Sequence, residues 1–192
     1  MPDAASEPER SLLDLTVREL LDSVAARTPA PGGGGVAALV TAMAAGLTGM
    51  AARFGDGAVA ARADELRAAA APLADADAAA YGAFLAATRR PRDEPGRAEA
   101  VARARADTIA VPVVIADVAG EVAGLAADLV LNGNPNLRSD AAAAVHLAAG
   151  AAATAAELLA ANVKGEQGAA ERDRAREIAE AARVLTTQVG RE

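Results

Sequence analysis

Apolar residues recur along the chain at intervals of three and four, which is the spacing of one face of an α-helix. The first stretch of this kind contains Leu13, Val17, Leu20 and Val24. Ser11 and Asp14 precede most of it and resemble a capping box, with Asp in place of the usual Glu. The pattern therefore predicts a first amphipathic helix over about residues 12–27.

The rest of the chain repeats this pattern between residues that break helices. Residues 28–35 contain two prolines and four glycines, so we expect them to be irregular. Beyond them we expect helices over about residues 36–54, 58–88, 97–131, 139–163 and 166–189. Pro72 is expected to kink the second of these or to start a new first turn, and Pro112 to bend the third. Ser139 and Asp140 stand where N-cap residues belong.

These segments predict an all-α fold, an alanine-rich bundle of about six helices. We expect residues 11–192 to form a single domain and residues 1–10 to form a disordered tail. The first helix after the glycines carries no charge until Arg53, so we expect it to be buried on nearly every side.

Composition supports a helical protein, because 58 of the 192 residues are alanine and only 2% are aromatic. A buried alanine hides little apolar area, so an alanine core favours further burial in a homodimer. The absence of cysteine excludes disulfides, a thiolate zinc site and a cysteine nucleophile. It also fits a cytoplasmic protein, and the first ten residues lack the features of a signal peptide.

Charge and apolar runs limit the partners that we expect. A net charge of −7 gives no general attraction for nucleic acid. The longest uncharged runs, residues 36–52 and 141–156, are shorter than a bilayer span of about 20 residues, so we expect no membrane partner. His146 is the only histidine, which excludes a site with several histidine ligands, and we expect no metal.

Two segments could carry chemistry. The glycine run stands just before a helix, where bare backbone N–H groups could approach a ligand, although a flexible connector is the simpler interpretation. Asp77 and Tyr81 are four residues apart and share a helical face made otherwise of alanine. A carboxylate on such a face could be a general base if buried, and a solvated surface residue if not.

A third segment, Asn132 to Asp140, is rich in asparagine. Its side chains could form a polar pocket for a heterocycle, or they could simply cap helices and form a turn. Arginines around residues 89–97 could grip carboxylates, but the acids between them favour ordinary surface pairing.

The ordered set of segments PAPGGGGVAAL, DADAAAY, RRPRDEP, Val111-Pro112 and GNPNLRSD resembles the cyclodeaminase/cyclohydrolase family. The resemblance covers about residues 12–163. It implies an all-helical homodimer that holds a tetrahydrofolate derivative as substrate, in a cleft near the glycine loop and the subunit contact. It implies no metal and no prosthetic group.

The resemblance also implies roles for individual residues. The second acid of the family's D-x-D-A-x-A-F/Y signature, thought to transfer the proton, is Asp77. The implied substrate-binding residues are Pro31, Gly32, Gly33, Gly34, Gly35, Tyr81, Arg92, Asn134, Ser139, Asp140 and Asn162. The chain departs from the family pattern at Gly35, which replaces a hydroxyl residue, and at Leu158, which replaces an asparagine. A basic and aromatic cluster after the second helix is missing.

The resemblance implies two reactions. One is that of a methenyltetrahydrofolate cyclohydrolase, the hydrolytic opening of the 5,10-methenyl bridge, and the other is that of a formiminotetrahydrofolate cyclodeaminase, which closes the ring and releases ammonia. A chain without a transferase half looks more like the cyclohydrolases. The alternative is a divergent member that binds a folate-like ligand, or a structural helical dimer, without turnover.

Overall fold

The structure, a computed structural model, describes residues 10–190. Over this range the chain forms seven α-helices and two short 3-10 helices, and no β-strand. The α-helices are α1 (Val17–Ala25), α2 (Gly33–Ala52), α3 (Gly57–Ala70), α4 (Leu73–Arg89), α5 (Arg97–Asn132), α6 (Arg138–Asn162) and α7 (Ala169–Val189), and the 3-10 helices are η1 (Leu12–Asp14) and η2 (Pro135–Leu137). The predicted all-α class is confirmed. The predicted tail over residues 1–10 lies, except for Arg10, outside the described residues.

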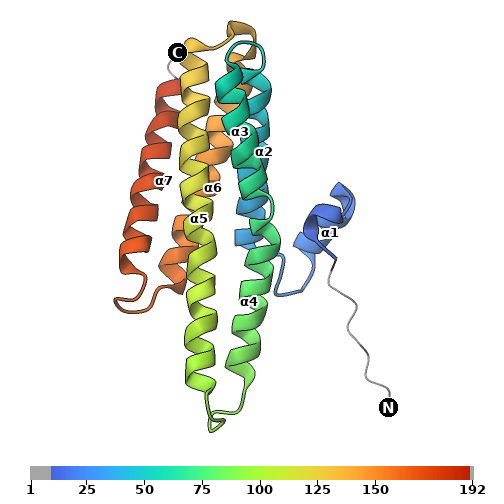
Figure 1. Ribbon diagram of the computed structural model, residues 1–192, viewed down its shortest axis with the longest axis vertical. Helices are drawn as coiled ribbons and strands as arrows, with labels where there is room; N and C mark the ends of the chain where they lie inside the picture. Colours follow the sequence, from blue (N-terminus) through green and yellow to red (C-terminus); the bar gives the residue numbers. More distant parts are fainter. Residues whose placement is uncertain (1–9, 191–192) are drawn as a thin grey trace.

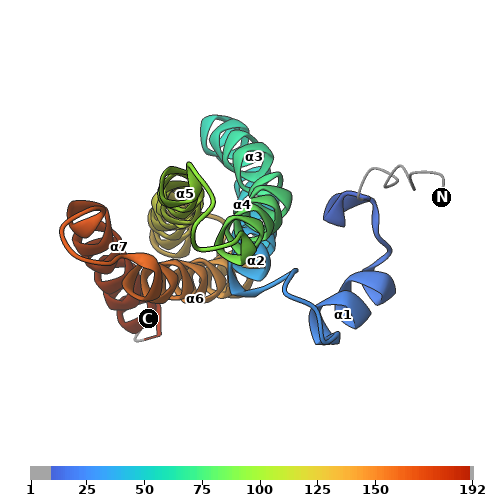
Figure 2. The same cartoon turned by 90° about the horizontal axis from the view of Figure 1, so that it is seen from below.

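Helices α2 to α7 form an elongated bundle (Figure 1). Helix α5 has 36 residues, runs the length of the bundle and packs against α4, α6 and α7. Helices α3 and α4 follow one another along one side, because Pro72 ends the first and is the N-cap of the second. Helix α2 packs against α3 and α6. Helix α1 stands apart from the bundle, as Figures 1 and 2 both show.

The core is built mainly from alanine. On α2 every buried residue is Gly, Ala or Thr, and the larger side chains that are almost fully buried are few, among them Ile115, Val122, Val145 and Leu159. Small faces allow the helix axes to approach closely, which is how alanine-rich helices can still exclude water. The buried hydroxyls of Thr41 and Thr48 donate to carbonyl oxygens one turn earlier in α2, so neither is left unpaired.

The N-terminal helix differs from the prediction. Instead of one helix over residues 12–27, the chain forms η1, extended backbone at Leu15 and Thr16, and then α1. The complete capping box lies at Thr16 and Glu19, where each side chain accepts the other residue's backbone N–H. This reciprocal pair starts a new helix at Val17, whereas Ser11 caps only the short η1 turn.

Two other helix starts also differ. Gly33, Gly34 and Gly35 were expected in an irregular loop, but they form the first turn of α2. The first helical turn has no intrahelical N–H bonds to make, so glycine costs less there than in a helix interior. Ser139 and Asp140 are not N-caps, because η2 leads directly into α6, and they lie in the first turn after Leu137.

One strip of α2 is exposed, contrary to the expectation of burial on nearly every side. Met43 is 58% exposed, and Val36, Val40 and Leu47 are only partly buried. These residues follow the same helical face at spacings of four, three and four. The strip is therefore an apolar surface that the described residues cover only in part.

Three segments are long and apolar enough to cross a bilayer, judged by length and composition alone. They are α2, α5 and residues 135–162, and the apolar windows in them are 56%, 50% and 44% buried inside the protein. The uncharged runs over residues 36–52 and 141–156 belong to helices that are longer than the runs. The shortness of these runs therefore does not exclude a membrane-spanning helix. The absence of a membrane partner stays a prediction.

Candidate active site

At the N-terminus of α2, Gly33 is exposed to solvent, whereas Gly34 and Gly35 are buried. Gly32 is the N-cap of α2 and has no side chain to accept the N–H groups of the first turn. Within residues 10–190 the N–H groups of Gly33 and Gly34 have no hydrogen-bond acceptor, whereas the Gly35 N–H donates to Asp77 Oδ2 at 2.9 Å. The free N–H groups carry the positive end of the helix dipole, so they favour an oxygen acceptor.

Asp77 reaches this helix end from the first half of α4. A Cβ on Gly34 would lie only 2.0 Å from Asp77 Oδ1, so the carboxylate occupies the space that any side chain at position 34 would need. Burial raises the pKa of Asp77, and the hydrogen bond from the Gly35 N–H partly opposes this rise. A carboxyl with a raised pKa is suited to both accepting and returning a proton near neutral pH.

A pocket of about 260 Å³ opens beside this carboxylate. It is lined by Pro29, Ala30, Gly32, Gly33, Gly34, Asp77, Tyr81, Thr108, Leu158 and Asn162. Six of these are predicted site residues, and they come from the start of α2, from α4 and from the end of α6. Tyr81 lies one helical turn beyond Asp77, as their spacing indicates. The fold thus brings together six of the residues that the family resemblance implied as site residues.

Asn162 is placed at the pocket by a proline in another helix. Pro112 lies inside α5 and has no N–H to donate to the carbonyl oxygen of Thr108, four residues earlier. Asn162 Nδ2 donates to this oxygen at 3.0 Å instead. The Val111-Pro112 dipeptide of the sequence therefore has a structural role, because it frees the acceptor that fixes the Asn162 side chain.

Asp75 serves a different purpose from Asp77. Two residues apart on a helix point in nearly opposite directions, and Asp75 faces the N-terminal segment. It accepts a hydrogen bond from Ser11 Oγ at 2.5 Å and from the Leu12 N–H at 2.8 Å. Pro31 lies with Asp75 beside a separate pocket rather than in the one beside Asp77. The first acid of the signature thus anchors the chain, and the second faces the candidate site.

Arg105 and Phe84 lie near this pocket and were not predicted from the sequence. The Arg105 guanidinium lies 5.1 Å from the centroid of the Phe84 ring, and its Nη1 donates to the Asn162 carbonyl oxygen at 3.4 Å. Arg105 has no carboxylate partner in the described part of the chain. Arg105 lies three residues before Thr108 on α5, and Phe84 lies three residues after Tyr81 on α4. No signal in the sequence links these two helices, so the pair could not be found from it.

The remaining predicted residues lie far from Asp77 within one chain. Arg92 is exposed in the turn between α4 and α5. Asn134, Ser139 and Asp140 lie at the opposite end of α6 from Asn162, and 23 residues of helix separate Ser139 from Asn162, or about 35 Å. A single chain therefore does not bring these residues to the pocket beside Asp77.

Comparison with known proteins gives this arrangement a family. The chain matches the family model described as Formiminotransferase-cyclodeaminase over residues 16–183. The chain belongs to the formiminotransferase-cyclodeaminase family. All the residues that line the pocket beside Asp77 lie within the matched range.

Individual relatives agree with this assignment. The chain is 35% identical to formimidoyltransferase-cyclodeaminase of Mus musculus and 34% identical to that of Sus scrofa, over 156 residues in each case. Each alignment covers 73% of this chain, and the chain spans only 28% of the length of these relatives. A crystal structure of formiminotetrahydrofolate cyclodeaminase from Thermotoga maritima has a TM-score of 0.78 over 93% of both chains. Its sequence identity is 24%, so it shows a shared fold.

Proposed function

We propose that this protein acts on the one-carbon unit between N5 and N10 of tetrahydrofolate, with Asp77 as the proton-transfer residue. Membership of the formiminotransferase-cyclodeaminase family supports a folate-related activity. The observation that carries the proposal is a half-buried carboxylate with a raised pKa beside two free N–H groups and an open pocket.

The geometry best supports hydrolysis of the 5,10-methenyl bridge. The methenyl carbon belongs to a cationic amidinium, which the ionised Asp77 favours over a neutral competitor. Water attacks this carbon while Asp77 accepts one of its protons. The bond from the carbon to one nitrogen then breaks, and that nitrogen takes up the proton from Asp77 as the formyl group forms. One proton is released to solvent, and no oxidation state changes.

The free N–H groups of Gly33 and Gly34 favour this reaction in particular. They are donors, so they pair with an oxygen that carries negative charge, such as the water oxygen while Asp77 removes its proton. The leaving amino group of the deaminase reaction is itself a donor and gains nothing from them.

The second candidate is the cyclodeaminase reaction, which the names of the relatives favour. N10 of 5-formiminotetrahydrofolate attacks the formimino carbon and forms the new C–N bond. Asp77 accepts the proton from N10 and delivers it to the amino group, which leaves as ammonia. Starting from the amidinium form, the step moves one proton within the site and needs none from solvent.

One spectrophotometric assay separates these reactions, because 5,10-methenyltetrahydrofolate is the substrate of one and the product of the other. Purified protein mixed with it should consume its absorbance faster than the spontaneous rate. Added to 5-formiminotetrahydrofolate, a cyclodeaminase would instead raise this absorbance and release ammonia. Binding of either compound without any absorbance change would support the member without turnover and overturn the catalytic proposal.

We also propose that Arg105 binds the glutamate carboxylate of the substrate. It is a half-buried cation at the pocket edge with no acid opposite it, and Phe84 holds its guanidinium from one face. The Tyr81 and Phe84 rings then lie along α4 where the aminobenzoyl group would pass. Arg105→Gln should therefore weaken binding of glutamate-bearing folates more than it lowers the rate of bound substrate.

We further propose a homodimer. The partly exposed apolar strip on α2 supports it, as do the apolar windows of α2 and α6, about half of which are not buried. A second subunit could also bring its Asn134, Ser139 and Asp140 toward this pocket.

A further inference from the structure

The N-terminal arm, which we define as residues 10–25, has an amphipathic helix whose apolar face is left exposed by the described residues. None of the residues of α1 is buried, and Val17 and Leu21 are 73% and 63% exposed. Val24, 42% exposed, lies on the same face of α1 at helical spacing. Leu13, 49% exposed, lies in η1 before this helix, and we call these four residues the apolar stripe of the arm. A nine-residue helix is too short to be stable alone in water, so it needs a surface to pack on.

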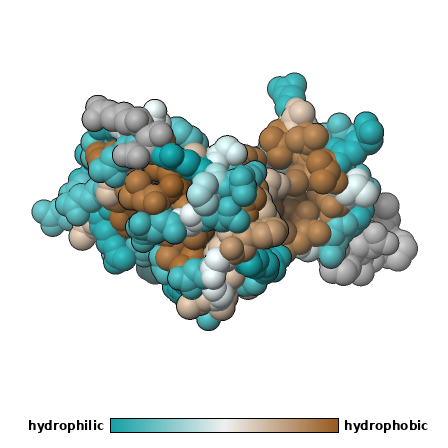
Figure 3. All heavy atoms as spheres, turned by 90° about the horizontal axis from the view of Figure 1, so that it is seen from above, coloured by the Kyte–Doolittle hydropathy of each residue, from teal (hydrophilic) through white to brown (hydrophobic). Residues whose placement is uncertain are grey.

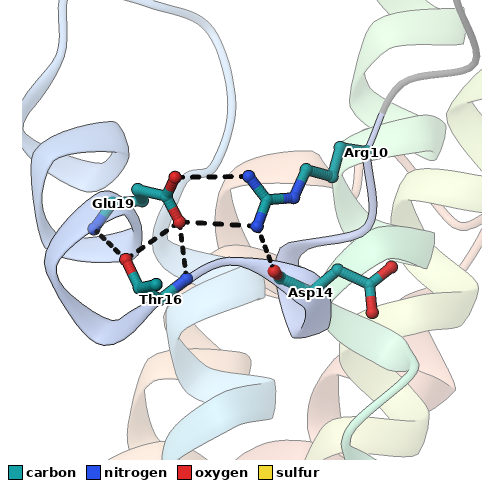
Figure 4. Close-up of polar contacts among 4 residues, drawn as sticks. All are labelled: Arg10, Asp14, Thr16 and Glu19. Carbon is teal, nitrogen blue, oxygen red and sulfur yellow. Dashed lines mark hydrogen bonds and ion pairs between the residues drawn. The ribbon is translucent and has the colours of Figure 1, made fainter.

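The arm is nevertheless fixed at its start. There, Asp75 on α4 accepts hydrogen bonds from Ser11 and Leu12. Arg10 then bridges the turn, because its guanidinium pairs with Glu19 at 3.2 Å and donates to the Asp14 carbonyl oxygen (Figure 4). At its other end, residues 26–32 connect α1 to α2. The start of the arm is thus tied to α4, while the apolar stripe stays exposed.

This stripe lies beside a hollow. In Figure 3 hydrophobic surface gathers over the part of the molecule that contains α1 and continues into the hollow between this part and the bundle. Figure 2 shows that α1 stands apart from α2 and α6.

The charges on α1 favour a protein over a lipid surface as the occupant. Its polar side carries Arg18, Glu19 and Asp22, a net negative set, whereas helices that lie on membranes carry mostly Lys and Arg there. A second copy of this chain offers a matching surface, since Met43 in the apolar strip of α2 is exposed and so is Leu147 on α6, which packs beside α2.

We propose that the arm of one copy packs its apolar stripe, Leu13, Val17, Leu21 and Val24, on the α2–α6 face of a second copy, and that this exchange is reciprocal. The inference rests on the homodimer proposed above and adds the segment that holds it together. The arm continues into Pro29 and Ala30, which line the pocket, and it is tied to α4 through Asp75. A partner that holds the arm would therefore also hold these two walls of the candidate site, the segment at Pro29 and helix α4.

The first test is the double variant Val17→Glu/Leu21→Glu, measured by sedimentation velocity over a dilution series. Removing two apolar side chains from the interface should raise the dimer dissociation constant by about 100-fold or more. Arg18→Glu is the matched control, because it makes the same change of charge on the polar side of the same helix, and it should leave the dimer intact. Circular dichroism checks that each variant stays helical.

The outcomes separate this inference from the homodimer itself. A wild-type chain that stays monomeric would overturn both. A wild-type dimer that the double variant leaves unchanged, or that Arg18→Glu weakens equally, would overturn the arm alone.

A cross-linking experiment tests the contact without weakening it. The chain has no cysteine, so Leu21→Cys gives a single attachment point for a thiol-reactive benzophenone. Mixing this chain with isotope-labelled wild type and irradiating it should join the arm to α2 or α6 of the labelled copy. Capture only within the same chain would show that the arm folds back on its own bundle, and the inference would fall.

Discussion

Two neighbouring glycines at the start of α2 should respond to alanine in opposite ways. A Cβ on Gly34 would stand 2.0 Å from Asp77 Oδ1 and 2.4 Å from its Cγ. A Cβ on Gly33 would meet nothing closer than Leu158 Cδ2 at 3.8 Å, an ordinary contact. In Gly34→Ala the carboxylate must therefore rotate away, which breaks its 2.9 Å hydrogen bond from the Gly35 N–H.

The expected magnitudes follow from these contacts. Losing a hydrogen bond to a charged group costs about 1.5–3 kcal/mol, and replacing glycine by alanine returns at most about 1 kcal/mol, the value for a helix interior. Gly34→Ala should thus lower the free energy of unfolding by about 1 kcal/mol, or the melting temperature by about 2–4 °C. Gly33→Ala should lose nothing and gain up to about 1 kcal/mol.

The two variants, Gly34→Ala and Gly33→Ala, should differ more in kcat than in the free energy of unfolding. With its carboxylate displaced, Gly34→Ala should lose about 10²-fold or more in kcat, as expected for removal of a general base. Gly33→Ala should keep kcat within a small factor. Steady-state rates with 5,10-methenyltetrahydrofolate, together with urea unfolding of both variants, check this. Wild-type turnover in a folded Gly34→Ala protein would refute the placement of Asp77 as the proton-transfer residue.

Three further predictions concern the same pocket. Asp77→Asn should stay folded and lose about 10²-fold or more in turnover, and equal kcat would contradict its assigned role. Because the pKa of Asp77 is raised in the folded protein, its contribution to stability falls as pH rises from the ordinary aspartate range through the raised pKa. Urea unfolding should thus show that the free energy of unfolding of Asp77→Asn rises relative to that of wild type over this pH interval. A difference between the two free energies that does not change with pH would exclude the raised pKa. Asn162→Ala should cost about 1–3 kcal/mol by leaving the Thr108 carbonyl without its donor, and adding Pro112→Ala should recover part of this, since alanine restores an N–H. A double-mutant cycle without coupling would contradict that link.

The helices could be predicted from the sequence because apolar spacing and breakers are local signals. Their ends were less predictable. The sequence contains two sites that resemble a capping box, and only the one at Thr16 makes both reciprocal hydrogen bonds. The glycine run signals a break, but Gly33 to Gly35 continue into α2 because Asp77, more than forty residues away, accepts the N–H of Gly35.

The candidate site was predictable where its members are neighbours in sequence and not elsewhere. The spacing of Asp77 and Tyr81 is enough to place both on one helical face. Arg105 was missed because its partners Phe84 and Asn162 lie on other helices, and only the fold brings them together. Conversely, the family resemblance placed residues of the asparagine-rich turn, Asn132 to Asp140, in the same pocket. This turn lies at the start of α6 and the pocket at its end, so the length of the helix separates them.

The alanine core has a consequence for how stability varies with temperature. Unfolding exposes apolar surface in proportion to the side chains that were buried, and this exposure sets the heat-capacity change, which averages about 12–15 cal/mol/K per residue in globular proteins. A core whose buried residues are largely alanine exposes less apolar surface per residue than one built from leucine and phenylalanine. Its heat-capacity increment should fall below that average, so its stability curve is flatter and declines less steeply on cooling as well as on heating.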